Sequence, residues 1–243
     1  MDIDGHYIYG GRYALSPDGS TLAFVGLGDE GSLQIFITGI DGSGVRQVTN
    51  DPVAAIMPAW SPDGTTIAYK GYASGGDPRL FVLDVATGEA TKVIDVSAKP
   101  WEGWPTFTPD GSSLLYSGSA GVSTVPVAGG KSTVLFGRGR GGMGNAGGGS
   151  MSPDGSLVTM MGNEPDGPGA LRFVANANGT DLRVISGYSS TPAGTWSPDG
   201  TRIVCTDGSK YILVVDVATG KATEVAEGSA AIWLDDHTLL VEV

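Results

Sequence analysis

Two segments of this chain hold residues whose types could recognise or transform a ligand. In Pro100-Trp101-Glu102-Gly103-Trp104, two indoles flank one carboxylate. In the glycine-rich stretch 137–149, Arg138 and Arg140 supply two guanidinium groups. Exposed indoles usually mark a surface that a partner covers, and guanidinium groups hold carboxylates in bidentate geometry. The two segments therefore favour recognition of a protein segment or of a small anionic ligand. The alternative for Trp104 is packing between repeats, so Trp101 is the better candidate for binding.

Residues suited to catalysis are scarce. The chain has two histidines, His6 and His237, which could serve as imidazole bases, but they do not have a metal-ligand spacing. His237 also occupies the place of a turn glycine, where a solvated residue is expected. Its clustered acids, such as Glu164-Pro165-Asp166, lack the alternating ligand spacing of a calcium loop. We therefore predict no catalytic residue, no metal site and no cofactor. A carbohydrate-active enzyme stays open as the alternative, with Glu102 or Asp51 as the carboxylate and the tryptophans as sugar platforms.

The elements that must position these residues are marked by one repeated turn. Its prolines lie 45, 47, 44 and 45 residues apart, a period typical of repeat architectures. In each copy proline fixes φ, aspartate accepts local backbone N–H bonds and glycine takes a positive φ, so the turn is a scaffold element. The five copies are Ser16–Gly19, Ser61–Gly64, Thr108–Gly111, Ser152–Gly155 and Ser197–Gly200.

Apolar, β-rich segments flank every turn, and a second hairpin follows each of them. Each repeat is therefore predicted to be a four-stranded antiparallel meander, the blade of a β-propeller. Helices are not expected, because no long segment has a 3.6-residue apolar period and 40 glycines would interrupt one. The second hairpins span Phe36–Val48, Leu80–Val93, Val122–Leu135, Phe173–Ile185 and Ile212–Val225.

A sixth, degenerate copy is predicted over Ala231–Leu240, with Asp235 in the place of the proline and His237 in the place of the glycine. The chain stops at Val243, before the two outer strands of that blade. We expect the N-terminal segment Asp2–Tyr9 to close this edge, because a free strand edge promotes association. A chain trimmed from a longer protein is the alternative. The prediction is thus an all-β, six-bladed propeller forming a single domain over residues 1–243.

The combination of a large apolar residue, Ser-Pro-Asp-Gly and an apolar strand, as in Trp60 to Tyr69 and Trp196 to Cys205, resembles the WD40-like PD40 repeat of TolB-type propellers. The resemblance covers the chain from about Arg12 to Val243. It implies a periplasmic or other extracytoplasmic module that binds partner proteins around its channel mouth, although a cytoplasmic protein is possible. The same repeat occurs in the propellers of prolyl oligopeptidase-like enzymes and of oligogalacturonate lyase, so a propeller belonging to a larger peptidase-like enzyme stays open.

Successive blades of a propeller present equivalent loops to the same rim. The irregular loops should therefore converge around one channel mouth, away from the regular turns. The predicted ligand-binding residues there are Arg12, Asp51, Tyr72, Arg79, Trp101, Glu102, Trp104, Arg138, Arg140 and Tyr188.

Composition excludes several classes of partner. A net charge of −12 repels phosphate backbones and anionic lipid, which argues against nucleic-acid binding. No run of about 18 apolar residues exists, so we expect no membrane insertion and no signal peptide in this sequence. The single cysteine, Cys205, lies in an apolar strand and is expected to be a buried thiol. We expect a monomer.

Overall fold

The structure is a computed structural model that describes residues 2–3, 6–7, 13–72, 78–96, 103–137, 146–163, 170–187, 195–207 and 209–242. All regular secondary structure in these ranges is β-strand, which confirms the predicted all-β class. The first half of the strands are β1 (Asp2–Ile3), β2 (His6–Tyr7), β3 (Tyr13–Leu15), β4 (Thr21–Leu27), β5 (Leu33–Gly39), β6 (Arg46–Gln47), β7 (Ala54–Trp60), β8 (Thr66–Tyr72), β9 (Pro78–Asp84), β10 (Ala90–Asp95), β11 (Thr106–Phe107) and β12 (Ser113–Gly118). The second half are β13 (Gly121–Pro126), β14 (Thr133–Gly137), β15 (Ala146–Met151), β16 (Leu157–Asn163), β17 (Ala170–Asn176), β18 (Arg183–Gly187), β19 (Thr195–Trp196), β20 (Arg202–Thr206), β21 (Tyr211–Asp216), β22 (Ala222–Glu227), β23 (Ala230–Trp233) and β24 (Leu239–Glu242).

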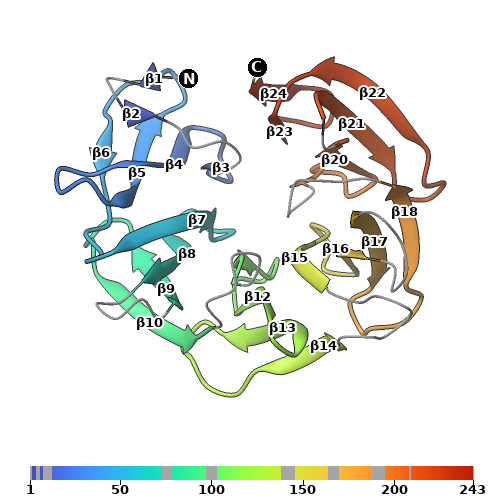
Figure 1. The fold of residues 1–243 in the computed structure, drawn as a ribbon, viewed down its shortest axis with the longest axis horizontal. Helices are drawn as coiled ribbons and strands as arrows, with labels where there is room; N and C mark the ends of the chain where they lie inside the picture. The colour runs from blue at the N-terminus through green and yellow to red at the C-terminus, as the bar shows by residue number, and fades with distance from the viewer. Residues whose placement is uncertain are drawn as a thin grey trace. The chain divides into compact units, whose positions relative to one another are not determined.

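The strands pair as antiparallel meanders of four, as the repeat predicts (Figure 1). Three four-stranded sheets follow chain order, β11 to β14, β15 to β18 and β19 to β22. The first two meanders, β3 to β6 and β7 to β10, join into one eight-stranded sheet through a single parallel bridge between Leu33 and Ala54. The remaining pairs are β1 with β2 and β23 with β24. The six-blade count and closure by the N-terminal segment stay predictions.

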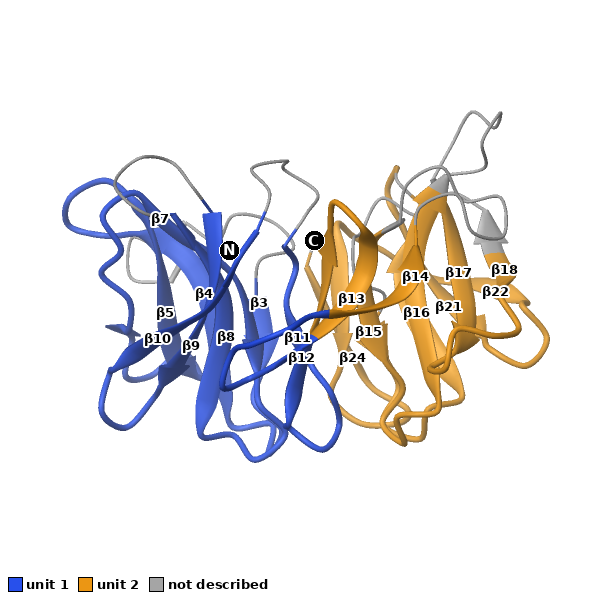
Figure 2. Cartoon of the chain, turned by 90° about the horizontal axis from the view of Figure 1, so that it is seen from below, with its two compact units in different colours: residues 1–114, 125–132 blue, residues 115–124, 133–243 orange. Residues whose placement is uncertain are grey.

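Two compact units make up the chain (Figure 2). Unit 1 comprises residues 1–114 and 125–132, and unit 2 comprises residues 115–124 and 133–243. The core of unit 1 includes buried Ile35, Ile67 and Tyr69, and that of unit 2 includes buried Phe136 and Val158. A single domain over residues 1–243 stays a prediction.

The repeated turn has the geometry that its residues predict. In the second copy the Ser61 hydroxyl donates to Asp63 Oδ1 at 2.6 Å and accepts from the Thr66 backbone N–H at 3.0 Å. Gly64 adopts a φ of 71°, a conformation that glycine takes without steric cost. The hydroxyl to aspartate bond recurs at 2.5–2.6 Å in all five copies. The turn therefore satisfies its own polar groups, which suits a scaffold.

Three tryptophans that precede the turn residues each donate a hydrogen bond to the preceding repeat. Trp60 Nε1 donates to the Ala14 carbonyl at 3.1 Å, and Trp196 and Trp233 make the same bond to Ser150 and Thr195 at 3.2 and 3.0 Å. In each case the acceptor is a residue of the preceding repeat's first strand or next to it. The indole thus has a fixed orientation relative to the turn before it.

The sixth copy exists as the hairpin β23–β24, but its turn is one residue shorter than the sequence alignment predicts. Trp233 pairs with Leu239 rather than Leu240, whereas Trp196 pairs with Ile203. The Leu234 N–H bonds to the Thr238 carbonyl, four residues on, and the equivalent bond in the fifth copy spans five residues, from Ser197 to Arg202. Without the Pro-Asp-Gly sequence, the turn tightens by one residue.

Candidate functional site

The two ends of the strands in unit 1 differ in kind, and the candidate site lies at the end away from the repeated turns, here termed the loop end. A row of apolar residues crosses five neighbouring strands there. Strand register places them opposite one another in the order Leu27, Leu33, Ala54, Tyr72 and Pro78. Directly paired side chains contact each other across strands, so the row forms a continuous apolar band that runs from exposed Leu27 to buried Pro78. Leu27 is 39% exposed, and Val53, beside the row, is 44% exposed.

Trp104 packs onto this surface beside Tyr72. Both rings contact a buried cluster of Val25, Ile56 and Met57. The indole Nε1–H of Trp104 is buried and meets no acceptor among the described residues. A buried donor without an acceptor costs about 1–3 kcal/mol, and native structures rarely keep one without a reason. Trp104 thus differs from the three tryptophans at the turns, whose indole N–H groups all have acceptors.

Backbone strain lies directly beneath the two rings. Met57 has a φ of 61°, and the register of β7 against β8 shifts between Ile56 and Ala59. A non-glycine residue with positive φ costs about 1–3 kcal/mol and tends to occur where function requires it. The bulge places the Met57 side chain, which is 7% exposed, in the cluster that supports Trp104 and Tyr72.

A buried lysine adds positive charge below the same surface. Lys70 is fully buried, and its Nζ lies 5.4 Å from the centre of the Tyr72 ring, within the range of a cation–π contact. Gly103, next to Trp104, has a φ of 85°, and a Cβ there would lie 3.3 Å from Lys70 Cδ. The lysine stem is therefore packed against the backbone that carries Trp104.

Asp51 lies on the opposite face of β8. Its Oδ1 would be 3.0 Å from a Cβ on Gly71, and Tyr69, two residues before Gly71 on the same face, hydrogen-bonds to its carboxyl group. Burial raises the pKa of Asp51 above the usual 3.8, and the bond from Tyr69 offsets part of that rise. Burial and the nearby Asp51 charge raise the pKa of Tyr69.

The backbone of Asp51 is fixed by a buried amide. Gln34, 1% exposed, donates from Nε2 to the Asp51 carbonyl at 2.8 Å and accepts the Asp51 N–H at 3.1 Å. Thr49 Oγ1 also donates to Gln34 Oε1 at 2.8 Å. These bonds hold the loop that precedes β7 in one position.

Arg79 shares the face of Asp51 because it pairs with Gly71. Its Nε lies 3.0 Å from Asp95 Oδ1, in an ion pair whose side chains are 35% and 67% exposed. Lys92 and Arg79 together lower the pKa of Asp95. Arg79 therefore forms an ion pair with a residue of β10, and this exposed pair contributes little to stability.

The sequence-predicted residues thus divide into three groups. Tyr72 and Trp104 lie together at the loop end. Asp51 and Arg79 lie near the same strand ends on the other face of the sheet. The other predicted residues lie outside the described residues: Arg12, Trp101, Glu102, Arg138, Arg140 and Tyr188.

Two functional candidates were missed by sequence reasoning. Lys70 has a sequence signal, because it is a charged residue in an otherwise apolar strand, eight residues after its turn proline, where the other repeats have Val25, Ser117, Met161 and Thr206. Met57 has none, since a methionine in an apolar strand does not reveal a positive φ.

Within the described ranges, no three His, Cys, Asp or Glu residues cluster closely enough to hold a metal ion. The part of the chain that the structure describes contains no helix long and apolar enough to cross a membrane.

Comparison with protein families identifies the class of protein. The family model of PD40, the TolB beta propeller domain, matches residues 9–135, more than half of the chain. The chain therefore belongs to the PD40 family of TolB-type β-propellers. A comparison with curated proteins found no match in sequence.

Solved structures agree on the fold. TolB from Acinetobacter baumannii matches with a TM-score of 0.75 and 17% identity, covering 93% of this chain but 56% of that chain. An oligogalacturonate lyase in complex with manganese matches with a TM-score of 0.59 and 15% identity, covering 93% and 78%. A nidogen/laminin complex matches with a TM-score of 0.64 and 14% identity, covering 91% and 81%. At these identities the likeness establishes the propeller fold and not a shared activity. The chain spans little more than half the length of the TolB structure.

Proposed function

We propose that this propeller is a non-catalytic binding module that recognises a protein segment at the loop end of unit 1. The observation that carries the proposal is Trp104, a half-buried aromatic residue beside Tyr72 whose indole donor has no acceptor among the described residues. Aromatic residues on a fixed support supply most of the energy in protein recognition, because they bury large areas with little loss of side-chain entropy. Because this nitrogen is buried in the free protein, the indole would have to move to expose its N–H, and a backbone carbonyl of the bound segment would then accept it.

The surrounding groups suit such a ligand. The apolar row from Leu27 to Pro78 offers the length of an extended segment. Lys70 supports the Tyr72 ring through a cation–π contact, which helps to fix the aromatic anchor in position. A small anionic ligand at the same surface is the alternative to a protein segment in this proposal. We further propose that the protein acts as a monomer outside the cytoplasm.

Peptide selection followed by two substitutions tests the proposal. Peptides would be selected on the wild-type protein from a random phage-displayed library, and their dissociation constants measured by calorimetry. Trp104→Phe should weaken binding about tenfold, the effect of losing one buried hydrogen bond of about 1.4 kcal/mol. Tyr72→Ala should weaken it further, and Lys221→Ala, at an exposed site in unit 2, should leave it unchanged. Peptides whose affinity survives both aromatic substitutions would exclude this surface.

A carbohydrate-active enzyme is the second candidate, and Asp51 is the observation that favours it. A carboxyl group with a raised pKa beside a tyrosine resembles a general acid, and one structural neighbour is an oligogalacturonate lyase. Turnover of polygalacturonate, or of any of a small panel of polysaccharides, that is lost in Asp51→Asn would favour the enzyme. Absence of turnover across the panel would favour the binding module.

A further inference from the structure

A groove lies at the turn end of unit 1, away from the site above, between the first two copies of the repeated turn. Its volume is about 400 Å³. One wall belongs to the first turn and the other to Trp60 and the second turn. The lining residues are Ser16, Pro17, Asp18 and Thr21 on one side, and Trp60, Pro62, Asp63 and Gly64 on the other.

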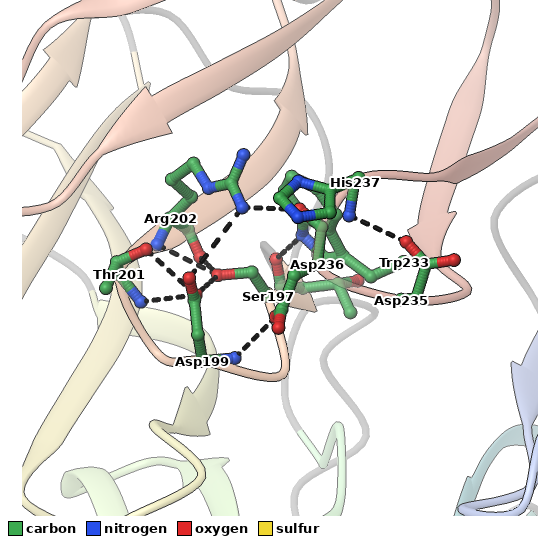
Figure 3. Close-up of polar contacts among 9 residues, drawn as sticks. Ser197, Asp199, Thr201, Arg202, Trp233, Asp235, Asp236 and His237 are labelled. Carbon is green, nitrogen blue, oxygen red and sulfur yellow. Dashed lines mark hydrogen bonds and ion pairs between the residues drawn. The ribbon is translucent and has the colours of Figure 1, made fainter.

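The chain contains a second version of this groove, and there it is filled. Between the fifth and sixth copies, in unit 2, the side chain of Arg202 lies across the face of Trp233, with its guanidinium carbon 5.0 Å from the ring centre (Figure 3). Arg202 Nη2 lies 3.7 Å from Asp199 Oδ2 and donates to the Asp236 carbonyl. The guanidinium is thus bound by an aromatic face, a carboxylate and a carbonyl oxygen.

The first wall and the tryptophan of the two grooves correspond residue by residue. Arg202 follows Pro198 by four residues, as Thr21 follows Pro17, and Asp199 corresponds to Asp18. The two tryptophans are held alike, because Trp60 bonds to Ala14 and Trp233 to Thr195, each three residues before the turn proline. The open groove therefore has the tryptophan and the carboxylate of the filled one.

What the first groove lacks is the arginine. Thr21 has a short side chain where Arg202 extends over the indole, and this difference leaves the volume open. The fourth copy has Leu157 at that position beside Trp196, and the second copy has Thr66 with Phe107 in place of the tryptophan. Among these repeats, only the first combines a small residue with a tryptophan wall.

The charge of the groove favours a cation. Hydrogen bonds from Ser16 and Ser20 lower the pKa of Asp18 to about 2, and bonds from Ser61 and Thr65 lower that of Asp63. Both carboxylates are therefore ionised at neutral pH. A planar guanidinium can stack on the indole while it donates to a carboxylate, which a compact ammonium group does less well.

We propose that the groove between the first two turns binds an arginine side chain of a partner protein, in the manner in which Arg202 occupies the equivalent groove. The guanidinium lies over Trp60 and beside Asp18 and Asp63. This proposal does not rest on the binding function at the loop end, because the groove shares no residue with that site.

A titration with a short peptide tests the proposal on the intact chain. The probe is acetyl-Gly-Arg-Gly-amide, followed by the indole N–H signal of Trp60 in ¹H–¹⁵N spectra, which is assigned by its loss in Trp60→Phe. A single exposed cation–π contact with ion pairing should give a dissociation constant on the order of 10 mM. The citrulline peptide, which is neutral and nearly isosteric, should shift the Trp60 signal at least tenfold less. Equal binding of the two peptides would overturn the proposal.

Substitutions taken from the other repeats sharpen the test. Thr21→Arg should fill the groove as Arg202 does, and Thr21→Leu should fill it as the fourth copy does, so each should weaken peptide binding at least tenfold. Thr66→Arg is the matched control at the groove that has Phe107, and it should leave binding unchanged. If the folded Thr21→Arg and Thr21→Leu proteins bind the arginine peptide as the wild type does, the groove is not the site.

Discussion

Tryptophan and aspartate residues have opposite environments at the two ends of the strands in unit 1. At the turn end, Trp60 has an acceptor for its indole N–H, and Asp63 receives hydrogen bonds that lower its pKa. At the loop end, Trp104 has a buried donor without an acceptor among the described residues, and burial raises the pKa of Asp51. The turn end is largely satisfied within the chain, whereas the loop end keeps unsatisfied groups and strain. Polar groups that a fold leaves unsatisfied are the ones that a partner can satisfy.

Gly64→Val should have the largest effect on stability. The valine would have to adopt a φ of 71°, although the nearest atom to its Cβ, Pro17 Cδ, is 3.7 Å away, so the backbone conformation alone carries the cost. We expect a loss of about 1–3 kcal/mol in the free energy of unfolding, measured by urea denaturation.

Gly137→Val is the matched control. Gly137 has no positive φ, and the nearest described atom to a Cβ there would be the Ala120 carbonyl oxygen, at 4.0 Å. Equal losses in the two variants would mean that turn geometry does not set the cost.

The same substitution at two tryptophans should give different results. Trp60→Phe leaves the Ala14 carbonyl without its donor. It should cost about 1 kcal/mol more than Trp104→Phe, which removes a donor that has no acceptor within the described ranges. Urea denaturation of both variants measures the difference. Equal costs would show that the Trp104 indole is satisfied in solution, which would remove the contrast between the two ends.

Stability should depend on pH in opposite directions at the two carboxylates. The pKa of Asp63 is lowered in the folded state, so its contribution is present above the unfolded value of about 3.8 and lost as the pH falls below it. The pKa of Asp51 is raised, so the folded state loses stability through this group as the pH rises from about 3.8 through the folded pKa.

Urea denaturation between pH 3 and 7 measures both effects. Relative to wild type, Asp63→Asn should lose most stability at pH 7 and least at pH 3. For Asp51→Asn, the free energy of unfolding relative to wild type should be highest at pH 7. Parallel curves for the two variants would contradict the opposed pKa shifts.

The sequence predicts the scaffold well because local residues determine it. Proline, aspartate and glycine in the turn of Ser61–Gly64 specify its geometry without reference to distant contacts, and the four-stranded meander follows from the same period. The sixth turn was predicted one residue too long, because an ungapped alignment of Trp233 with Trp196 cannot show that the hairpin closes earlier.

The candidate site was predicted only in part because it depends on which face of a strand each residue occupies. Tyr72 and Asp51 were both expected at the loop end. Side chains alternate along β8, however, so Tyr72 lies on one face of the sheet and Gly71, which Asp51 contacts, lies on the other. The strain at Met57 arises from a bulge, which no residue type in that strand marks.

The most direct test of the central claim follows the indole N–H signals of the tryptophans while a selected peptide binds. Trp60, Trp196 and Trp233 already donate to carbonyl groups, and Trp104 does not within the described structure. Binding at the loop end should therefore move the Trp104 indole proton downfield as it gains an acceptor, by more than any of those three signals. A Trp104 signal that stays in place at saturation, while the peptide shifts residues elsewhere, would contradict recognition at this surface.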